Sequence, residues 1–208
     1  MSDLNATTRV RADALLNRRR LFEAARDAIA VHGLEVSALD IAKVAGVGVG
    51  TLYRRFGTKD ALLDTVVLGL YDELVEVARE QLNSSDAWDG LATFLMELAH
   101  AHRESKGLAE VTAACDREPG PEIAERTAAL QDAVQRLTAR AHASGDLRAD
   151  VSWEDALLSS RASLSTDHCL GVDGGSDGWR RIMSLLLDGM RARPTGTASN
   201  PDHGEGPR

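Results

Sequence analysis

The 208-residue chain has little of what marks secreted, metal-binding or membrane proteins. It has only two cysteines, Cys115 and Cys169, which lie far apart with no neighbouring Cys or regularly spaced His. This pattern indicates neither a disulfide framework nor a zinc site. No apolar run approaches the ~20 residues of a membrane-spanning helix, and the polar first thirty residues lack the apolar core of a signal peptide. We therefore expect a cytoplasmic protein without metal, cofactor or membrane partner.

The sequence also lacks the usual marks of catalysis. It contains no paired carboxylates in an apolar setting, no nucleophile elbow and no glycine-rich phosphate loop, so we do not expect an enzyme. No segment alternates with the period of a strand, and no internal repeat is visible. Apolar residues instead recur at helical spacing along almost the whole chain, which predicts an all-α fold of about nine helices.

The net charge of −8 argues against nucleic-acid binding only if the charge is evenly spread. Residues 1–66 hold ten Lys and Arg against eight Asp and Glu, a net of +2, so the remaining residues carry a net of −10. A nucleic acid would therefore approach the N-terminal part. Arg9 and Arg11 are equally compatible with phosphate contacts and with a solubilising terminus.

A segment in the first third of the chain has the pattern of two short helices joined by a tight turn. Ser37 with Asp40 three positions later predicts a helix start, because the hydroxyl can accept a free backbone N–H and the acid favours the positive helix end. Gly46 supplies the positive φ that ends this helix. Leu52 and Phe56, four residues apart, predict the buried side of a second helix. This is the layout of a helix-turn-helix, whose second helix enters the DNA major groove.

The other side of this second helix carries residues suited to DNA. Val49 and Gly50 leave a flat surface for base edges, and the Tyr53 hydroxyl can reach a phosphate. Arg54 and Arg55 on the same helix can contact a phosphate or a guanine edge. The next helix begins with Thr58 and Lys59, which predicts a further anion site. The predicted DNA contacts are Ser37, Val49, Gly50, Thr51, Tyr53, Arg54, Arg55, Thr58 and Lys59.

Many spaced positions agree at once with one known family. Residues 17–64 resemble the DNA-binding domain of the TetR/AcrR family of transcriptional regulators. The resemblance rests on Gly33, Ile41-Ala42, Ala45-Gly46-Val47, Gly50-Thr51-Leu52-Tyr53, Phe56, Lys59 and Leu62. Two positions depart from the family pattern: Leu39 stands where some members carry a polar base reader, and Gly48 replaces the common Ser or Thr helix cap.

The resemblance implies a three-helix DNA-binding domain followed by a helical body that dimerises and holds a small ligand. We divide the chain into a helix-turn-helix domain at 11–57, a helical ligand-binding and dimerisation domain at 58–193, and a disordered tail at 194–208. Periodicity and breaks place the longer helices at 11–32, 59–81, 123–143, 153–170 and 179–191.

The family dimerises through its last two long helices, and small and apolar residues on the corresponding helices here fit that role. The predicted interface residues are Ala156, Ser160, Ser163, Trp179, Ile182 and Leu186. From the pattern alone, these residues could instead face their own core, since buried stripes are commoner than interface stripes. The candidates for a ligand pocket are Met96, His100, Cys115, Trp153 and His168, although no spacing ties them together and each is equally compatible with ordinary core or surface.

Together these features predict a ligand-responsive, sequence-specific DNA-binding transcriptional regulator. The expected mode is repression, with a homodimer on a palindromic double-stranded DNA operator that a small molecule releases. Activation stays open, because it depends on where the operator lies. The alternative is a helical interaction module without specific DNA binding.

Overall fold

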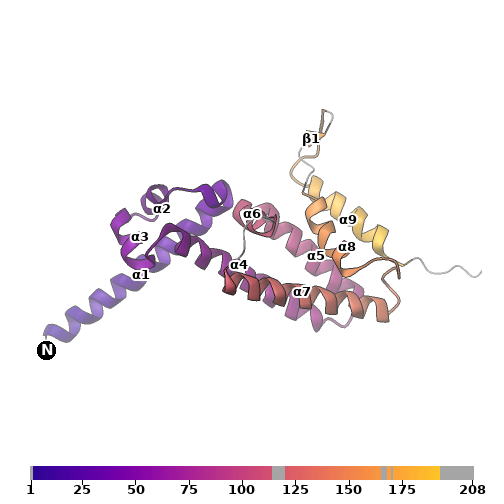
Figure 1. Cartoon of the computed structure of the whole chain (residues 1–208), viewed down its shortest axis with the longest axis horizontal. Coiled ribbons are helices and arrows are strands. Elements are labelled where there is room, and N and C mark those ends of the chain that lie inside the picture. The colour runs from indigo at the N-terminus through magenta and orange to yellow at the C-terminus, as the bar shows by residue number, and fades with distance from the viewer. Residues whose placement is uncertain (1, 114–119, 165–167, 170, 193–208) are drawn as a thin grey trace, which may run out of the picture.

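The computed structural model describes residues 2–113, 120–164, 168–169 and 171–192. Within these ranges the fold is all-α apart from one short hairpin, as the helical periodicity predicts. The N-terminal part, which we call the head (residues 2–56), lies at one end of the molecule in Figure 1. It contains α1 (Ser2–His32), the 3-10 turn η1 (Gly33–Glu35), α2 (Ala38–Val44) and α3 (Val49–Phe56).

The head is held together by apolar side chains from all three helices. Leu21 and Ile29 of α1, Ile41 of α2 and Leu52 of α3 are completely buried. The helix α1 begins at Ser2, nine residues before the predicted start at Arg11. The prediction began where apolar periodicity begins, but no Gly or Pro interrupts the polar residues before it, so the helix continues through them.

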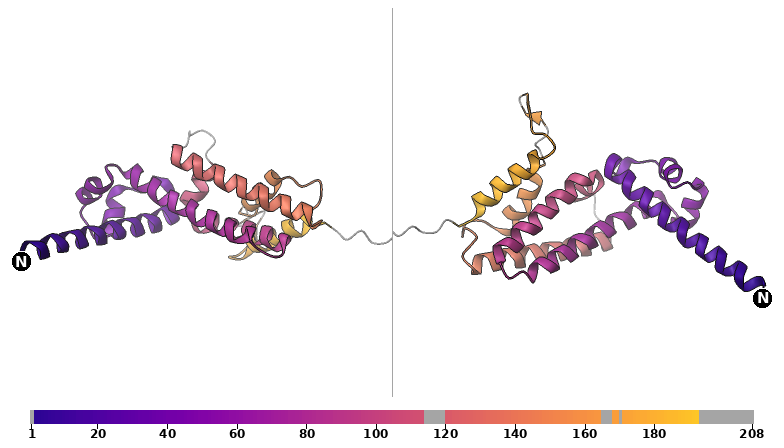
Figure 2. Two further views of the ribbon diagram at one scale, coloured as in Figure 1. Left: turned by 90° about the horizontal axis from the view of Figure 1, so that it is seen from below. Right: turned by 180° about the vertical axis from the view of Figure 1, so that it is seen from behind.

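The rest of the described chain is the body (residues 59–192). Its elements are α4 (Lys59–Leu82), α5 (Ala87–Glu104), α6 (Lys106–Ala113), α7 (Pro121–Ala143), α8 (Trp153–Ala162), β1 (His168–Cys169), β2 (Val172–Asp173) and α9 (Gly178–Met190). The long α4 runs from the head into the body and lies along α7, while α8 and α9 cover the opposite side of α5 (Figures 1 and 2). One broad apolar face of α4 is buried, as predicted: Leu62, Leu63, Val66, Val67, Leu70, Leu74, Val75 and Ala78.

The helix predicted at 153–170 is wrong in its second half, because α8 ends at Ala162. Ser159, Ser160 and Ser163 donate their hydroxyls to carbonyls three residues earlier, at 2.6–2.8 Å. Such bonds compete with helix continuation. The short strands β1 and β2 then pair antiparallel, and Gly171 between them adopts φ +81°, a left-handed conformation suited to a tight hairpin. These two-residue strands are too short to show a sequence period.

The other helix boundaries differ from the predictions by one or two residues. The helix α7 starts at Pro121 rather than Ile123, with proline in the first turn, where its missing N–H costs no hydrogen bond. None of the described helices is long and apolar enough to cross a membrane.

Candidate DNA-binding and ligand-binding sites

The predicted start of α2 is confirmed. The Ser37 hydroxyl oxygen accepts a hydrogen bond from the backbone N–H of Asp40 at 3.1 Å, and the hydroxyl donates to the Asp40 carboxylate at 2.5 Å. The turn after α2 is also as predicted, since Gly46 has φ +67° and the N–H of Val47 donates to the carbonyl of Ala42. These local bonds fix the angle at which α3 leaves the turn.

The helix α3 has one buried and one exposed side. Leu52 is fully buried and Phe56 half-buried, whereas Gly50, Tyr53, Arg54 and Arg55 are exposed. The exposed side therefore carries a phenol and two guanidinium groups beside a residue without a side chain. This is the predicted DNA-facing surface.

Two predicted contacts on α3 are less exposed than the others. Val49 is half-buried and packs partly against the head's core, so only part of its surface is open to DNA. Thr51 is also half-buried, and its hydroxyl oxygen accepts a hydrogen bond from Arg54 Nη2 at 3.2 Å. The bond orients the Arg54 guanidinium along the helix.

The start of α4 is capped as predicted, but Lys59 has a partner that the sequence did not reveal. The Thr58 hydroxyl oxygen accepts from the N–H of Ala61 at 3.0 Å. Lys59 Nζ donates to the carbonyl of Leu34 in η1 at 3.1 Å, and the N–H of Leu34 donates to the Glu110 carboxylate of α6 at 2.8 Å. Both backbone groups of Leu34, its N–H and its carbonyl, are thus hydrogen-bonded to side chains of the body.

The helix α6 also lies very close to α1. A Cβ on Gly107 would come within 2.1 Å of Ile29 Cγ2, and one on Gly33 within 2.4 Å of the Glu110 carboxylate. Glycine at both positions permits the close approach, and Gly33 additionally has φ +70°. The head and the body are therefore packed together at α6 as well as joined through α4.

A cavity of about 730 Å³ lies between the head and the body helices. Residues from η1, from the first turns of α4 and from α5–α8 line it, including Leu34, Lys59, Asp60, Leu63, Val67, Tyr71, Leu74, Phe94, Leu98, His102, Thr112, Thr127, Leu130, Gln131, Val134, Leu157, Leu158 and Arg161. A cavity of this size and apolar character is typical of a small-molecule site.

The predicted pocket residues are not the ones that line this cavity. A second, smaller pocket of about 340 Å³ is lined in part by His100. Met96 and Trp153 line neither this pocket nor the larger cavity. The His100 ring instead stacks on Trp179, with ring centroids 5.7 Å apart. Cys115 lies outside the described residues, and only the backbone of His168 is described, in β1. Sequence reasoning missed the residues that do converge.

The most distinctive polar cluster in the cavity contains His102 of α5, Thr112 of α6 and Arg161 of α8. His102 Nε2 and the Thr112 hydroxyl oxygen are 3.0 Å apart. Arg161 Nη1 donates to the same oxygen at 3.2 Å and to the carbonyl of Ala109 at 2.9 Å. Burial, together with the nearby charge of Arg161, lowers the pKa of His102 to about 4, so the imidazole is neutral at physiological pH.

One sequence pattern could have pointed to His102. Leu91, Leu95 and Leu98 recur at helical spacing, and His102 continues their stripe onto the next turn. A histidine on an apolar stripe is a buried polar group that needs a partner. Its actual partners come from two other helices, which no spacing in the sequence indicates.

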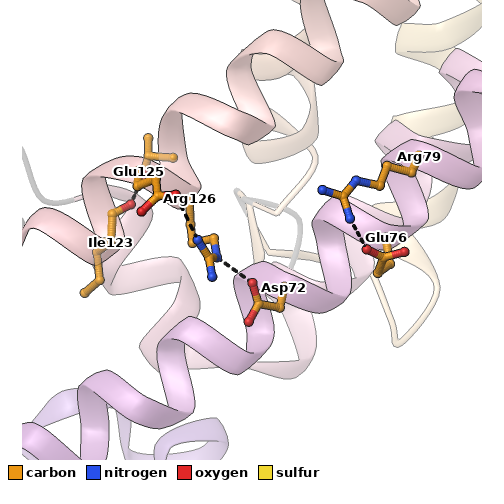
Figure 3. Close-up of polar contacts among 7 residues, drawn as sticks. Asp72, Glu76, Arg79, Ile123, Glu125 and Arg126 are labelled. Carbon is orange, nitrogen blue, oxygen red and sulfur yellow. Dashed lines mark hydrogen bonds and ion pairs between the residues drawn. The ribbon is translucent and has the colours of Figure 1, made fainter.

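A second polar group closes the cavity wall between α4 and α7. Tyr71 is buried, which raises the pKa of its phenol, and a hydrogen bond with Thr127 partly opposes this shift. Beside this pair, Arg126 Nε of α7 donates to the Asp72 carboxylate of α4 at 2.5 Å, which raises the pKa of Arg126 (Figure 3). These contacts hold α4 and α7 together along the cavity.

Four of the six predicted interface residues lie in the chain's own core. Ala156, Ser160, Ser163 and Trp179 are buried by their own chain and present no surface to a second one. Of the other two, Leu186 is half-buried and Ile182 is exposed. The apolar residues that α8 and α9 do expose are Leu158, Ile182 and Leu185.

Comparison with known proteins places both parts of the chain in one family. Residues 21–66 match the family of bacterial regulatory proteins named for tetR, and residues 86–192 match the C-terminal domain of SbtR-like transcriptional regulators. A TetR regulatory protein from Mycobacterium vanbaalenii is 28% identical, with a TM-score of 0.61 over 88% of this chain and 99% of that one.

Two further solved structures share the fold. A TetR transcriptional regulator from Streptomyces coelicolor is 24% identical, with a TM-score of 0.62 over 85% of this chain and 99% of that one. The regulator FadR from Bacillus subtilis, solved with stearoyl-CoA, is 20% identical, with a TM-score of 0.59 over 83% of this chain and 98% of that one. With the two family models spanning the head and the body, the chain belongs to the TetR family of bacterial transcriptional regulators.

Proposed function

We propose that this regulator is a repressor that binds a palindromic operator as a homodimer and leaves it when a small molecule enters the cavity. The observation that carries this proposal is the position of the cavity. Its lining includes Leu34 of the head and Lys59 at the start of α4, and also residues of the body helices, such as Arg161 of α8. A ligand inside it therefore contacts the elements that set the position of α3.

The exposed side of α3 reads the DNA. Gly50 has open space where a Cβ would stand, so the helix backbone can approach base edges. Arg54 and Arg55 supply guanidinium groups for phosphates or a guanine edge, and the Tyr53 hydroxyl contacts a phosphate. The exposed part of Val49 suits a thymine methyl group.

The residues around the two helix starts position the head on the phosphate backbone. Ser37 and Thr58 are exposed at the starts of α2 and α4, and Thr51 joins them from α3. The hydrogen bond to Leu34 uses one donor of the Lys59 ammonium, which leaves two others for a phosphate. Lys59 therefore serves both the head–body junction and DNA.

Ligand control acts through this junction. Lys59 binds the carbonyl of Leu34 and Glu110 binds its N–H, and Lys59 also lines the cavity. A ligand that fits better when α4 and α6 move apart shifts the head and changes the distance between the two heads of a dimer. Only a difference in ligand affinity between the two arrangements can drive this change.

The exposed side of α8 and α9 forms the dimer interface. Leu158, Ile182 and Leu185 are the apolar residues exposed there, and Leu186 borders them. A twofold dimer built on this face presents two α3 helices to half-sites about 34–36 Å apart.

The test is a fluorescence-polarisation titration of the full chain against the DNA upstream of its own gene, at several salt concentrations. We expect Tyr53→Ala and Arg54→Ala to lose specific binding. Arg136→Ala is the matched control, because Arg136 lies exposed on α7 and pairs only with Asp132 among the described residues. If the parent shows no specific binding here or to a selected DNA library, the proposal is wrong. If transcription from this DNA rises when the protein is present, the protein is an activator rather than a repressor.

A further inference from the structure

The cavity holds one guanidinium group whose hydrogen bonds to the protein are incomplete. Arg161 donates through Nη1 alone, to the Ala109 carbonyl and the Thr112 hydroxyl oxygen. Both acceptors are neutral. Among the described residues, Nε and Nη2 have no protein acceptor and no carboxylate pairs with this arginine, whereas Arg26 and Arg126 each pair with an acidic side chain.

Among the described residues, no acidic side chain forms an ion pair with Arg161. His102, which faces the same hydroxyl, is neutral and only 5% exposed. The acidic residues of the lining, Glu35, Asp60 and Asp64, belong to η1 and the first turns of α4, at the head end. The described lining that comes from α5, α6, α7 and α8 contains no acidic side chain, and Arg161 is its one permanently charged group.

The rest of the lining is mainly apolar. It includes Leu63, Val67, Leu74, Phe94, Leu98, Leu130, Val134 and Leu157, with Tyr71, Thr127 and Gln131 as polar residues among them. Apolar area of this extent favours a ligand with a hydrocarbon part, because that part leaves water on binding.

On the basis of the proposed function, we propose that the ligand is an amphipathic carboxylate. Its carboxylate binds the free Nε–Nη2 edge of Arg161, beside Thr112, and its apolar part lies along the α4–α7 side of the cavity. The planar edge of a guanidinium presents two parallel N–H groups that match the two oxygens of a carboxylate. Partial burial strengthens the pair relative to one in water.

The test measures binding of four probes with the same hydrocarbon chain to the full-length protein by isothermal titration calorimetry, each below its micelle concentration. Dodecanoate is the expected ligand, and dodecanol, dodecylamine and dodecyl phosphate vary only the headgroup. We expect dodecanoate to bind at least about tenfold more tightly than the alcohol, since hydrogen bonds to charged groups exceed neutral ones by that order. The amine should bind most weakly.

Variants locate the headgroup. Arg161→Gln should remove the preference for dodecanoate over dodecanol while leaving the alcohol's affinity unchanged, and Arg161→Lys should restore part of the preference. Arg136→Gln, an exposed arginine on α7, is the matched control and should bind like the parent. Thermal melts of each variant establish that it is folded, and Arg161→Lys carries the test if the Gln variant is not.

Three results would overturn the proposal: equal affinity for acid and alcohol, a preference that survives in Arg161→Gln, or no binding of dodecanoate. Tighter binding of dodecyl phosphate than of dodecanoate would overturn the carboxylate assignment. The calorimetry needs no DNA, so it is independent of the operator titration. If the parent protein does not bind an operator, the proposed repressor function is wrong. If the parent shows no preference for the carboxylate headgroup, only the proposed ligand class is wrong.

Discussion

The buried histidine of the cavity makes a measurable prediction about stability and pH. His102 is 5% exposed, and its Nδ1 has no hydrogen-bond partner among the residues that the structure describes. Its pKa falls from an ordinary 6.5 to about 4 because burial and the charge of Arg161 disfavour the imidazolium. Lowering the pH between these two values protonates this histidine in the unfolded chain but not in the folded one.

The sign and the size follow from proton linkage. Because the unfolded state binds more protons in this window, the free energy of unfolding falls as the pH falls from about 6.5 toward 4, and it is unaffected by this group above about 7. Each unit of the pKa difference between the folded and unfolded chain is worth ~1.36 kcal/mol of unfolding free energy, and the pKa of His102 falls from 6.5 to about 4. At about pH 5 most of this effect is present. Lowering the pH from about 7.5 to about 5 should therefore reduce the free energy of unfolding by about 2 kcal/mol through this residue.

The assay is urea unfolding at fixed protein concentration across this pH range. His102→Gln should lose about 2 kcal/mol less than the parent between about pH 7.5 and 5, because glutamine does not titrate. His32→Gln, at an exposed histidine on α1, is the control and should keep the parent's pH dependence. Identical pH dependence in the parent and His102→Gln would refute the burial argument.

Three further substitutions test other parts of the molecule. Leu185 on α9 is 66% exposed, and Leu185→Glu should convert the proposed dimer to a monomer in sedimentation velocity, whereas Val31→Glu, at a side chain 69% exposed on α1, should not. If Leu185→Glu stays dimeric, the interface lies elsewhere. Gly33→Ala should lower the free energy of unfolding by more than about 1 kcal/mol in urea melts, because the new Cβ meets the Glu110 carboxylate and φ is +70°; an unchanged stability would contradict the close approach. Gly50→Ala should stabilise the protein by about 0.5–1 kcal/mol through helix propensity and yet weaken operator binding; unchanged affinity would mean that this backbone stays clear of the bases.

The head was predictable because its structure depends on local chemistry. The Ser37 cap, the positive φ at Gly46 and the buried Leu52 each depend on residues within a few positions along the chain. Lys59 marks the limit of this reasoning. Its place at a helix start is local, but its hydrogen bond to Leu34 crosses from α4 to η1 and appears only once the chain is folded.

The cavity could not be predicted for the same reason. Its polar cluster joins single residues of α5, α6 and α8, and the distances between them are set by how these helices pack. Met96 and His100 are candidates that no spacing ties together, and the sequence alone does not show which side of α5 faces the cavity. His102, on the same helix, faces it.

The predicted interface includes residues that the chain's own core buries, in part because α9 carries two apolar stripes. Trp179, Met183, Leu187 and Met190 form one stripe, which is buried in the chain's own core. The second stripe contains Ile182 and Leu185, which remain exposed. At about 100° per residue they lie about 100° and about 160° around the helix from Met183. Read together without packing, the two stripes look like one broad face, and Trp179 was assigned to the wrong one.

If both proposals hold, Leu158 connects the proposed dimer interface with the proposed ligand site. Leu158 of α8 is 63% exposed, and it also lines the cavity, one helical turn before Arg161. In a dimer built on α8 and α9, the second chain packs over Leu158 and so borders the cavity beside the guanidinium. The affinity for a carboxylate and the geometry of the dimer then depend on the same helix. A ligand can therefore change the spacing of the two heads at the interface as well as through α4.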